Sequence, residues 1–85
     1  MKPMIIDVRE FGEFASGHAE DAINIPVMRF MHDVPGELKD IDKEAPIILY
    51  CNNGSRASLA ERWLREYGFT NVTNGVNQEA VEAAQ

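Results

Sequence analysis

The sequence contains little cysteine, little histidine and no long hydrophobic run. Its 85 residues include one cysteine, which excludes an internal disulfide and a Cys-x-x-Cys redox pair. One cysteine and two histidines without further clustered ligands are poor support for zinc, so we expect no metal site. No apolar run approaches the roughly 20 residues that cross a bilayer, and the opening residues MKPMIIDVRE lack the apolar core of a signal peptide.

Positive charge is also scarce. Eight lysines and arginines stand against fourteen aspartates and glutamates, which gives a formal net charge of −6. With no basic patch to neutralise phosphates, we expect no nucleic-acid partner and no anionic membrane surface as a partner. Because nothing in the cysteine content requires an oxidising compartment, the expected location is the cytoplasm.

The residues that are present predict one small α/β domain spanning 1–85. Hydrophobic residues make up 45% and charged residues 26%, which is an ordinary composition for a folded domain. Short apolar runs predict strands at 4–8, 23–25, 46–50 and 69–73, and helical spacing predicts helices at 9–17, 27–34, 57–67 and 77–85. The alternation of strands and helices indicates a parallel sheet with helices on both faces.

The single cysteine, Cys51, ends a strand and precedes a helix, at the sheet edge where α/β proteins bind ligands. The loop that follows it is small and polar, because it consists of Asn52, Asn53, Gly54 and Ser55. A glycine lets the backbone curl tightly, so several N–H groups can converge on one point at the positive end of the helix dipole. This arrangement predicts a cradle for an anion, either the Cys51 sulfur or an oxyanion beside it.

Such a cradle would lower the pKa of the Cys51 thiol. Free cysteine has a pKa near 8.5, and helix N-termini with cationic neighbours bring it to roughly 3.5–7.5. Arg56 adds a positive charge at the rim, and a thiolate at neutral pH is a nucleophile. The alternative is a buried structural cysteine that packs like a small hydrophobic residue, and the loop position alone leaves both interpretations open.

Further motifs extend the pattern beyond the loop. The stretch CNNGSR (51–56) matches the Cys-x-x-Gly-x-Arg loop of the rhodanese family. The family's other motifs occur in the same order and spacing: IDVRE (6–10), EF (13–14), GH (17–18), AINIP (22–26) and YGF with the following Asn and Val (67–72). From about Ile6 to Val72 the sequence therefore resembles the rhodaneses, and most closely the small stand-alone type that includes the phage-shock proteins.

This resemblance implies a sulfurtransferase. In that chemistry the Cys51 thiolate takes the outer sulfur of a donor such as thiosulfate or a persulfide, and sulfite or another group leaves. A thiophilic acceptor such as cyanide or a thiol then removes the sulfur from the Cys51 persulfide. The resemblance also implies that the backbone N–H groups of residues 52–56 hold the terminal sulfur, and that no metal or organic cofactor takes part. The expected partners are small molecules, and the expected state is a monomer.

The sequence departs from the family at two turns. Glu20 and Asp21 replace the usual Pro-Gly, and since aspartate tolerates left-handed backbone we expect that turn to survive. The usual Gly-Gly pair after the last strand is reduced to Gly75, which affects the C-terminal wall of the pocket.

Four other polar residues are expected near the loop in supporting roles. Asp7 and Arg9 end a strand at the same sheet edge, and we predict an ion pair that ties this edge to Glu13 or another carboxylate, rather than contact with substrate. For His18, a structural hydrogen bond is favoured over a role as general base.

Two other functions compete with sulfur transfer. Cysteine phosphatases and arsenate reductases resemble a Cys-x5-Arg loop, but here Arg56 is five positions after Cys51, so the loop is one residue shorter. The smaller cradle suits one sulfur atom better than a tetrahedral phosphate. A non-catalytic binding module on the rhodanese fold is the other alternative, and the intact cysteine and loop argue against it.

Overall fold

Four parallel strands form the sheet at the centre of the molecule. The computed structural model describes residues 2–85, and its sheet has the strand order β2–β1–β3–β4. Every neighbouring pair of strands is parallel. The strands are β1 (Met4–Asp7), β2 (Ile23–Asn24), β3 (Ile47–Cys51) and β4 (Val72–Asn77). The predicted α/β architecture with a parallel sheet is confirmed.

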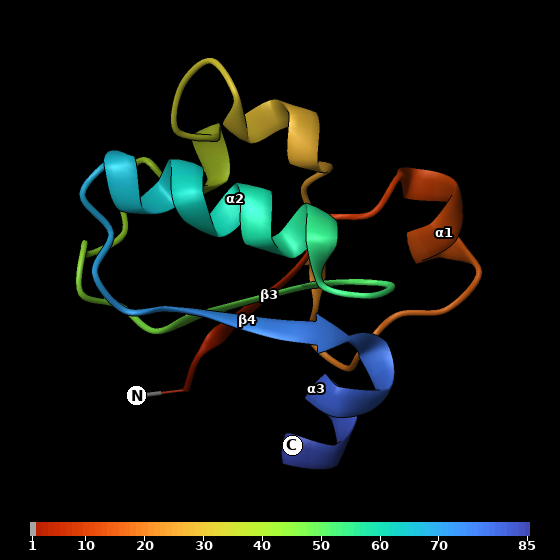
Figure 1. Cartoon of the computed structure of the whole chain (residues 1–85). Coiled ribbons are helices and arrows are strands. Elements are labelled where there is room, and N and C mark those ends of the chain that lie inside the picture. The colour runs from red at the N-terminus through yellow and green to blue at the C-terminus, as the bar shows by residue number, and fades with distance from the viewer. Residues whose placement is uncertain (1) are drawn as a thin grey trace.

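Helices cover both faces of this sheet, as predicted. The long helix α2 (Ser55–Glu66) lies on one face together with the 3-10 turns η1 (Val27–Phe30) and η2 (Gly36–Leu38), whereas α3 (Gln78–Ala84) lies on the other (Figure 1). The short helix α1 (Phe11–Ala15) stands beyond the end of the sheet at which β3 passes into α2 (Figure 1). The loop that contains the predicted cradle therefore lies at the same end of the sheet as α1 (Figure 1).

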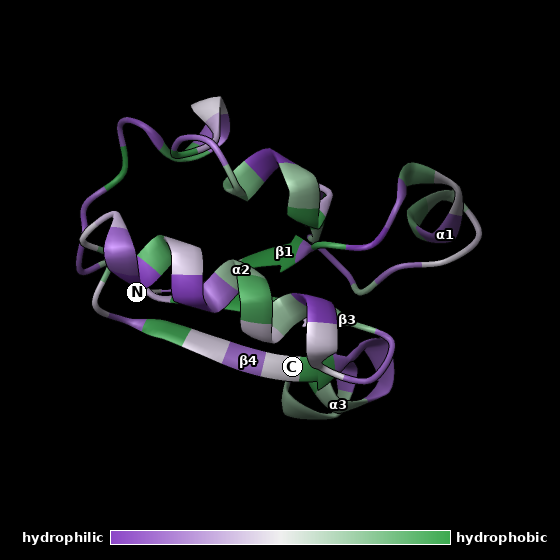
Figure 2. Cartoon of the chain, turned by 45° about the horizontal axis from the view of Figure 1, so that its top comes forward, coloured by the Kyte–Doolittle hydropathy of each residue, from purple (hydrophilic) through white to green (hydrophobic). Residues whose placement is uncertain are grey.

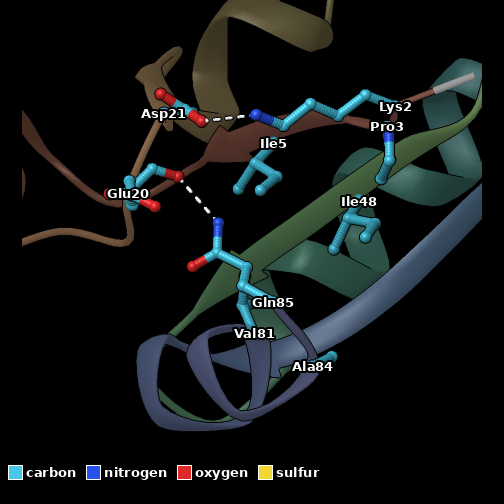
Figure 3. Close-up of a pocket in the computed structure, with 9 residues that line it drawn as sticks. All are labelled: Lys2, Pro3, Ile5, Glu20, Asp21, Ile48, Val81, Ala84 and Gln85. Atoms are coloured by element: carbon cyan, nitrogen blue, oxygen red, sulfur yellow. Dashed lines mark hydrogen bonds and ion pairs between the residues drawn. The ribbon is translucent and has the colours of Figure 1, made fainter.

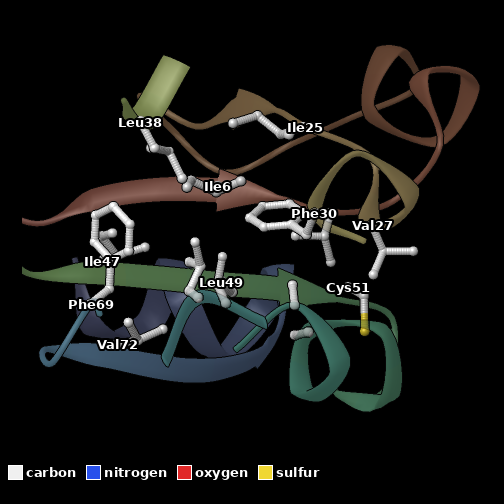
Figure 4. Packing of buried hydrophobic residues seen from close by; sticks show 14 residues of the cluster. Ile6, Ile25, Val27, Phe30, Leu38, Ile47, Leu49, Cys51, Phe69 and Val72 are labelled. Atoms are coloured by element: carbon white, nitrogen blue, oxygen red, sulfur yellow. The ribbon is translucent and has the colours of Figure 1, made fainter. Parts of the chain in front are cut away.

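The main core fills the space between the sheet and α2. Ala57, Ala60 and Leu64 recur at helical spacing and are fully buried, while hydrophilic residues alternate with them along α2 (Figure 2). They pack in one cluster with Cys51 and the following residues, most of which Figure 4 labels: Ile6, Val8, Ile25, Val27, Phe30, Leu38, Ile47, Leu49, Phe69 and Val72. Cys51 is thus part of the core as well as part of the loop.

The turn that replaces Pro-Gly survives, as expected. Asp21 adopts left-handed backbone with φ of 66°, and the Ala22 N–H donates to the Ala19 carbonyl oxygen at 3.1 Å. An aspartate accepts this conformation at modest cost, so the chain still enters β2.

The predicted strand at 69–73 is wrong in its bounds. β4 begins at Val72 and continues to Asn77. Phe69 instead closes the end of α2, because its N–H donates to the Leu64 carbonyl oxygen at 3.0 Å and its ring is 1% exposed. Its hydrophobicity reflects burial in the core and not strand pairing.

The predicted helix at 27–34 is shorter than expected. Only Val27–Phe30 is helical, as the 3-10 turn η1, and the chain then bends. Pro35 disfavours helical backbone at Val34, which prevents the apolar spacing from extending the helix.

A bulge interrupts β4 beside the loop. The register shifts between the partners of Leu49 and Tyr50, which leaves Gly75 as an extra residue. A Cβ atom on Gly75 would lie 2.7 Å from Val81 Cγ2 and 2.9 Å from Ile48 Cγ2. The one glycine that the chain keeps here is therefore required by close packing.

The next residue, Val76, is strained. It has φ of 75°, which β-branched residues rarely adopt, and its side chain is 42% exposed, so packing compensates little.

We expect Val76→Gly to raise the free energy of unfolding by about 1 kcal/mol, because relief of the strain outweighs the greater flexibility of glycine in the unfolded chain. Urea denaturation measures the change. The matched control, Thr73→Gly, removes an exposed β-branched residue from the same strand at ordinary φ and should lower stability; equal losses in both variants would contradict the prediction.

Candidate active site

The Cys51 sulfur lies at the top of the core, under the loop that joins β3 to α2. The residue is 1% exposed, and its side chain points toward the start of α2 (Figure 4). The Gly54 N–H donates to Sγ at 3.1 Å, and the backbone N–H groups of Asn53, Arg56 and Ala57 also act on the sulfur. The predicted convergence of N–H groups is therefore present.

The loop is held in this shape by its own side chains and by β4. Gly54 adopts φ of 91° as the residue before α2, a conformation that favours glycine. The Asn53 Oδ1 accepts hydrogen bonds from the Ser55 N–H at 3.0 Å and from the Ser55 hydroxyl at 2.8 Å. From the other side, the Asn74 amide donates to the Gly54 carbonyl oxygen at 3.0 Å. These contacts aim the N–H groups inward.

The pKa of the Cys51 thiol is lowered from its ordinary value. Burial by itself raises the pKa, and the hydrogen bonds from the backbone N–H groups, led by that of Ala57, outweigh it. The direction agrees with the sequence-based expectation, but the donor set differs. The sequence pattern missed Ala57, whose apolar side chain marks it as a core residue, because α2 begins at Ser55 and places the Ala57 N–H in the first helical turn.

Arg56, which was expected to add a positive charge at the rim of the loop, is paired with a carboxylate. Its Nη1 and Nη2 atoms donate to the two carboxylate oxygens of Glu13 at 2.7 and 3.0 Å. The Asn52 amide donates to the same carboxylate at 2.8 Å. The hydrogen bonds from Arg56, followed by that from the Glu10 backbone, lower the pKa of Glu13 to about 2, so Glu13 is ionised at neutral pH. These contacts tie α1 to the loop.

Asp7 and Arg9 form a buried ion pair with each other. The Arg9 Nε donates to Asp7 Oδ1 at 2.9 Å and its Nη2 to Oδ2 at 2.6 Å, and the Asp7 side chain is fully buried. Arg9 Nη2 also donates to the Gly17 carbonyl oxygen at 2.7 Å. The expected ion pair is present, but Glu13 is not a member of it, because that carboxylate binds Arg56.

Tyr50 completes this buried network, and the sequence analysis missed it. Its hydroxyl donates to Asp7 Oδ2 at 3.0 Å and accepts from the Ala19 N–H at 3.0 Å. In the sequence, Tyr50 looks like one more apolar residue of β3. Its position directly before Cys51 was the sequence feature that could have indicated a role for its hydroxyl group.

His18 occupies a structural position. Its ring stacks on Phe14 with 3.8 Å between centroids, and Nδ1 lies 2.9 Å from the Phe14 carbonyl oxygen. A carbonyl oxygen only accepts, so this contact requires the Nδ1–H tautomer. The contact supports the structural hydrogen bond that was favoured from the sequence.

A well-formed cavity lies away from this loop. It has a volume of about 400 Å³ and lies between α3 and the sheet, with Ile5, Ile48 and Val81 among its lining residues (Figure 3). An ion pair between Lys2 and Asp21 crosses its rim (Figure 3). Cys51 does not line this cavity, and its one amine, that of Lys2, is paired with Asp21, so the candidate site is placed at the loop.

Residues 2–85 contain neither a candidate metal site nor a candidate membrane span. Within that range, no group of three His, Cys, Asp or Glu side chains could hold a metal ion. In the same part of the chain, no helix is long and apolar enough to span a membrane.

Comparisons with solved structures support the same fold. A rhodanese with anions from Escherichia coli is 29% identical with a TM-score of 0.80, and the match covers 93% of this chain and 91% of that chain. A rhodanese-like domain protein from Staphylococcus aureus is 26% identical with a TM-score of 0.73, covering 92% of this chain and 71% of that one. The human single-domain sulfurtransferase TSTD1 shares the fold at 24% identity and a TM-score of 0.73, covering 96% of this chain and 80% of its own.

Curated relatives match over a similar region. The tRNA uridine(34) hydroxylase of Sodalis glossinidius is 37% identical over 71 residues, and that of Escherichia coli K12 is 34% identical over 71 residues. Each match covers 81% of this chain and 20% of the relative, so the chain spans about a fifth of their length. The family model described as "Rhodanese-like domain" matches residues 1–76. With its parallel sheet and its loop around Cys51, the chain belongs to the rhodanese-like domain family.

Proposed function

We propose that the protein is a sulfurtransferase that carries a sulfane sulfur as a persulfide on Cys51. The observation that carries this proposal is the convergence of backbone N–H groups on a buried sulfur, which lowers the thiol pKa. Membership of the rhodanese-like family supports it. The structural neighbour TSTD1, itself named a sulfurtransferase, shares the fold.

The reaction has two displacements. In the first, the Cys51 thiolate attacks the outer sulfur of the donor, the donor's S–S bond breaks, and the leaving group departs with the electron pair as sulfite, a sulfinate or a thiolate. In the second, a cyanide or thiolate acceptor attacks the terminal sulfur, and the electron pair of the Cys51 S–S bond returns to Sγ. The N–H groups stabilise negative charge on the thiolate and on the persulfide, so the same cradle serves both halves of the cycle.

The geometry favours sulfur over phosphate as the transferred group. Cys51 is 1% exposed beneath a short loop, so one terminal sulfur atom fits the approach better than a tetrahedral group. A lowered thiol pKa also argues against a purely non-catalytic module, which has no need of a thiolate. Sulfur transfer is favoured over tRNA hydroxylation, since the chain spans about a fifth of the length of those hydroxylases and has a net charge of −6. The monomeric state, the small-molecule partners and the cytoplasmic location stay predictions.

Intact mass tests the proposal. Incubation with thiosulfate or with methanethiosulfonate should add the mass of one sulfur atom, and cyanide should then remove it and release thiocyanate. Cys51→Ser should show neither step, because an alcohol at that position cannot form a persulfide. Hydrolysis of aryl phosphates by the wild type should stay at background. Sulfur transfer that persists in Cys51→Ser would overturn the mechanism, and phosphatase turnover that depends on Cys51 would support the rival.

A further inference from the structure

The two arginines beside the Cys51 loop are both neutralised by carboxylates. We propose that Glu13, by pairing with Arg56, is a specificity-determining residue that favours monoanionic sulfane-sulfur donors, such as organic persulfides or thiosulfonates, over the thiosulfate dianion. This inference rests on the proposed sulfur transfer and identifies its class of donor.

The Glu13 carboxylate is held firmly against Arg56. The two groups meet in a bidentate arrangement at 2.7 and 3.0 Å, a geometry that gives strong and directional pairing. The Asn52 amide and the Glu10 backbone N–H donate to the same carboxylate at 2.8 and 3.0 Å. With four donors around it, this carboxylate does not swing away when a donor molecule approaches. Arg56 therefore presents little net charge to an incoming anion.

No other positively charged side chain beside the loop replaces the neutralised charge of Arg56. Arg9 is bound by the buried Asp7 carboxylate and by the Gly17 carbonyl oxygen. The side chains between Cys51 and Arg56 are two asparagines, a glycine and a serine, all neutral. An anionic donor consequently meets backbone N–H groups and no uncompensated positive charge.

The charge that a donor brings therefore matters. The cradle is built around one sulfur atom and stabilises one negative charge, whereas thiosulfate carries a second charge that lacks a partner. Methanethiosulfonate has the shape of thiosulfate with one oxygen replaced by a methyl group, and it carries a single charge. Cys51 attack on its outer sulfur breaks the S–S bond, and methanesulfinate leaves with the electron pair. The two compounds thus isolate charge from size.

The test is Glu13→Gln, assayed with both donors. The glutamine amide oxygen still accepts a hydrogen bond from Asn52 or Arg56, but the positive charge of Arg56 is no longer cancelled. We expect kcat/KM for thiosulfate to rise about ten-fold and that for methanethiosulfonate about three-fold. The reason is that the unpaired positive charge of Arg56 attracts a dianion twice as strongly, in free energy, as it attracts a monoanion. Added salt should reduce the gain, which a purely structural effect would not show. Thiocyanate release with cyanide as acceptor gives the rates.

Two further variants control the result. Glu61→Gln removes the same charge and frees Arg65 from an ion pair, but Arg65 lies about 14 Å from Arg56 along the axis of α2, so the donor ratio should not change. Arg56→Met in the Glu13→Gln protein should abolish the gain. If Glu13→Gln leaves the ratio of kcat/KM for the two donors unchanged, the inference is overturned, whereas the proposed sulfur transfer is not affected. Failure of the wild type to take sulfur from either donor would instead overturn the proposed function and the inference with it.

Discussion

Arg9→Met is expected to lower the free energy of unfolding by about 3–5 kcal/mol, since it strips a buried carboxylate of its counter-charge. The Asp7 side chain is fully buried and would keep only the Tyr50 hydroxyl and the Arg9 backbone N–H as donors. Methionine retains the apolar stem, so the loss reports the charge and not the packing. Chemical denaturation followed by the fluorescence of Trp63 measures it.

Two comparisons decide whether the buried charge is the cause. Arg29→Met breaks an ion pair with Glu37 that is exposed on both sides, and it should cost no more than about 1 kcal/mol. Asp7→Asn combined with Arg9→Met removes the orphaned charge, so the double variant should be more stable than Arg9→Met alone. A double variant less stable than Arg9→Met would show that the pair acts in some other way. Cys51 alkylation in folded Arg9→Met should change less than stability does, as befits a supporting role.

Gly54→Val should slow persulfide formation about a hundred-fold, the effect of losing a backbone donor from an anion site. Gly54 has φ of 91°, which valine rarely adopts, so the loop must rearrange. A Cβ atom there would lie 3.6 Å from its nearest neighbours, hence the effect is conformational and not a clash. The rearrangement withdraws the N–H that donates to Cys51 Sγ. The midpoint of alkylation against pH should rise, because the thiolate loses stabilisation that the neutral thiol never had.

Gly36→Val is the matched control for this variant. Gly36 has ordinary φ, and nothing lies within 4 Å of a Cβ atom built there. Its substitution should leave both the alkylation midpoint and the rate of persulfide formation unchanged. If Gly54→Val keeps a midpoint below that of a free thiol, the Gly54 N–H is not needed to hold the sulfur.

Features encoded by neighbouring residues were predictable from the sequence. The buried strand before Cys51, the tight turn at Gly54 and the helix that follows depend on residues a few positions apart, and each occurs within two residues of its expected position. Asp21 likewise adopts the conformation that its short polar side chain allows. Local conformational preference and hydrophobic spacing were sufficient for these elements.

Pairings between distant residues were not predictable in the same way. Arg56 and Glu13 are 43 residues apart, and the sequence offered Arg9 as an equally reasonable partner for Glu13. Only the folded structure shows that Arg9 pairs with Asp7, so that Glu13 is available to pair with Arg56 of the loop. The strand predicted to begin at Phe69 was wrong for a related reason. Apolar residues are favoured both by burial in the core and by pairing in a strand, so the sequence pattern does not distinguish the two.

The contacts that hold the Cys51 loop in shape come from segments that precede and follow it in the chain. Glu13 of α1 holds it through Arg56, and Asn74 of β4 holds it through the Gly54 carbonyl oxygen. β3 itself lies between β1 and β4 in the sheet. A nascent or partly unfolded chain lacks one of these supports and presents Cys51 as an ordinary thiol. The lowered pKa of the Cys51 thiol therefore depends on contacts from both flanking segments, and so on completion of the whole fold.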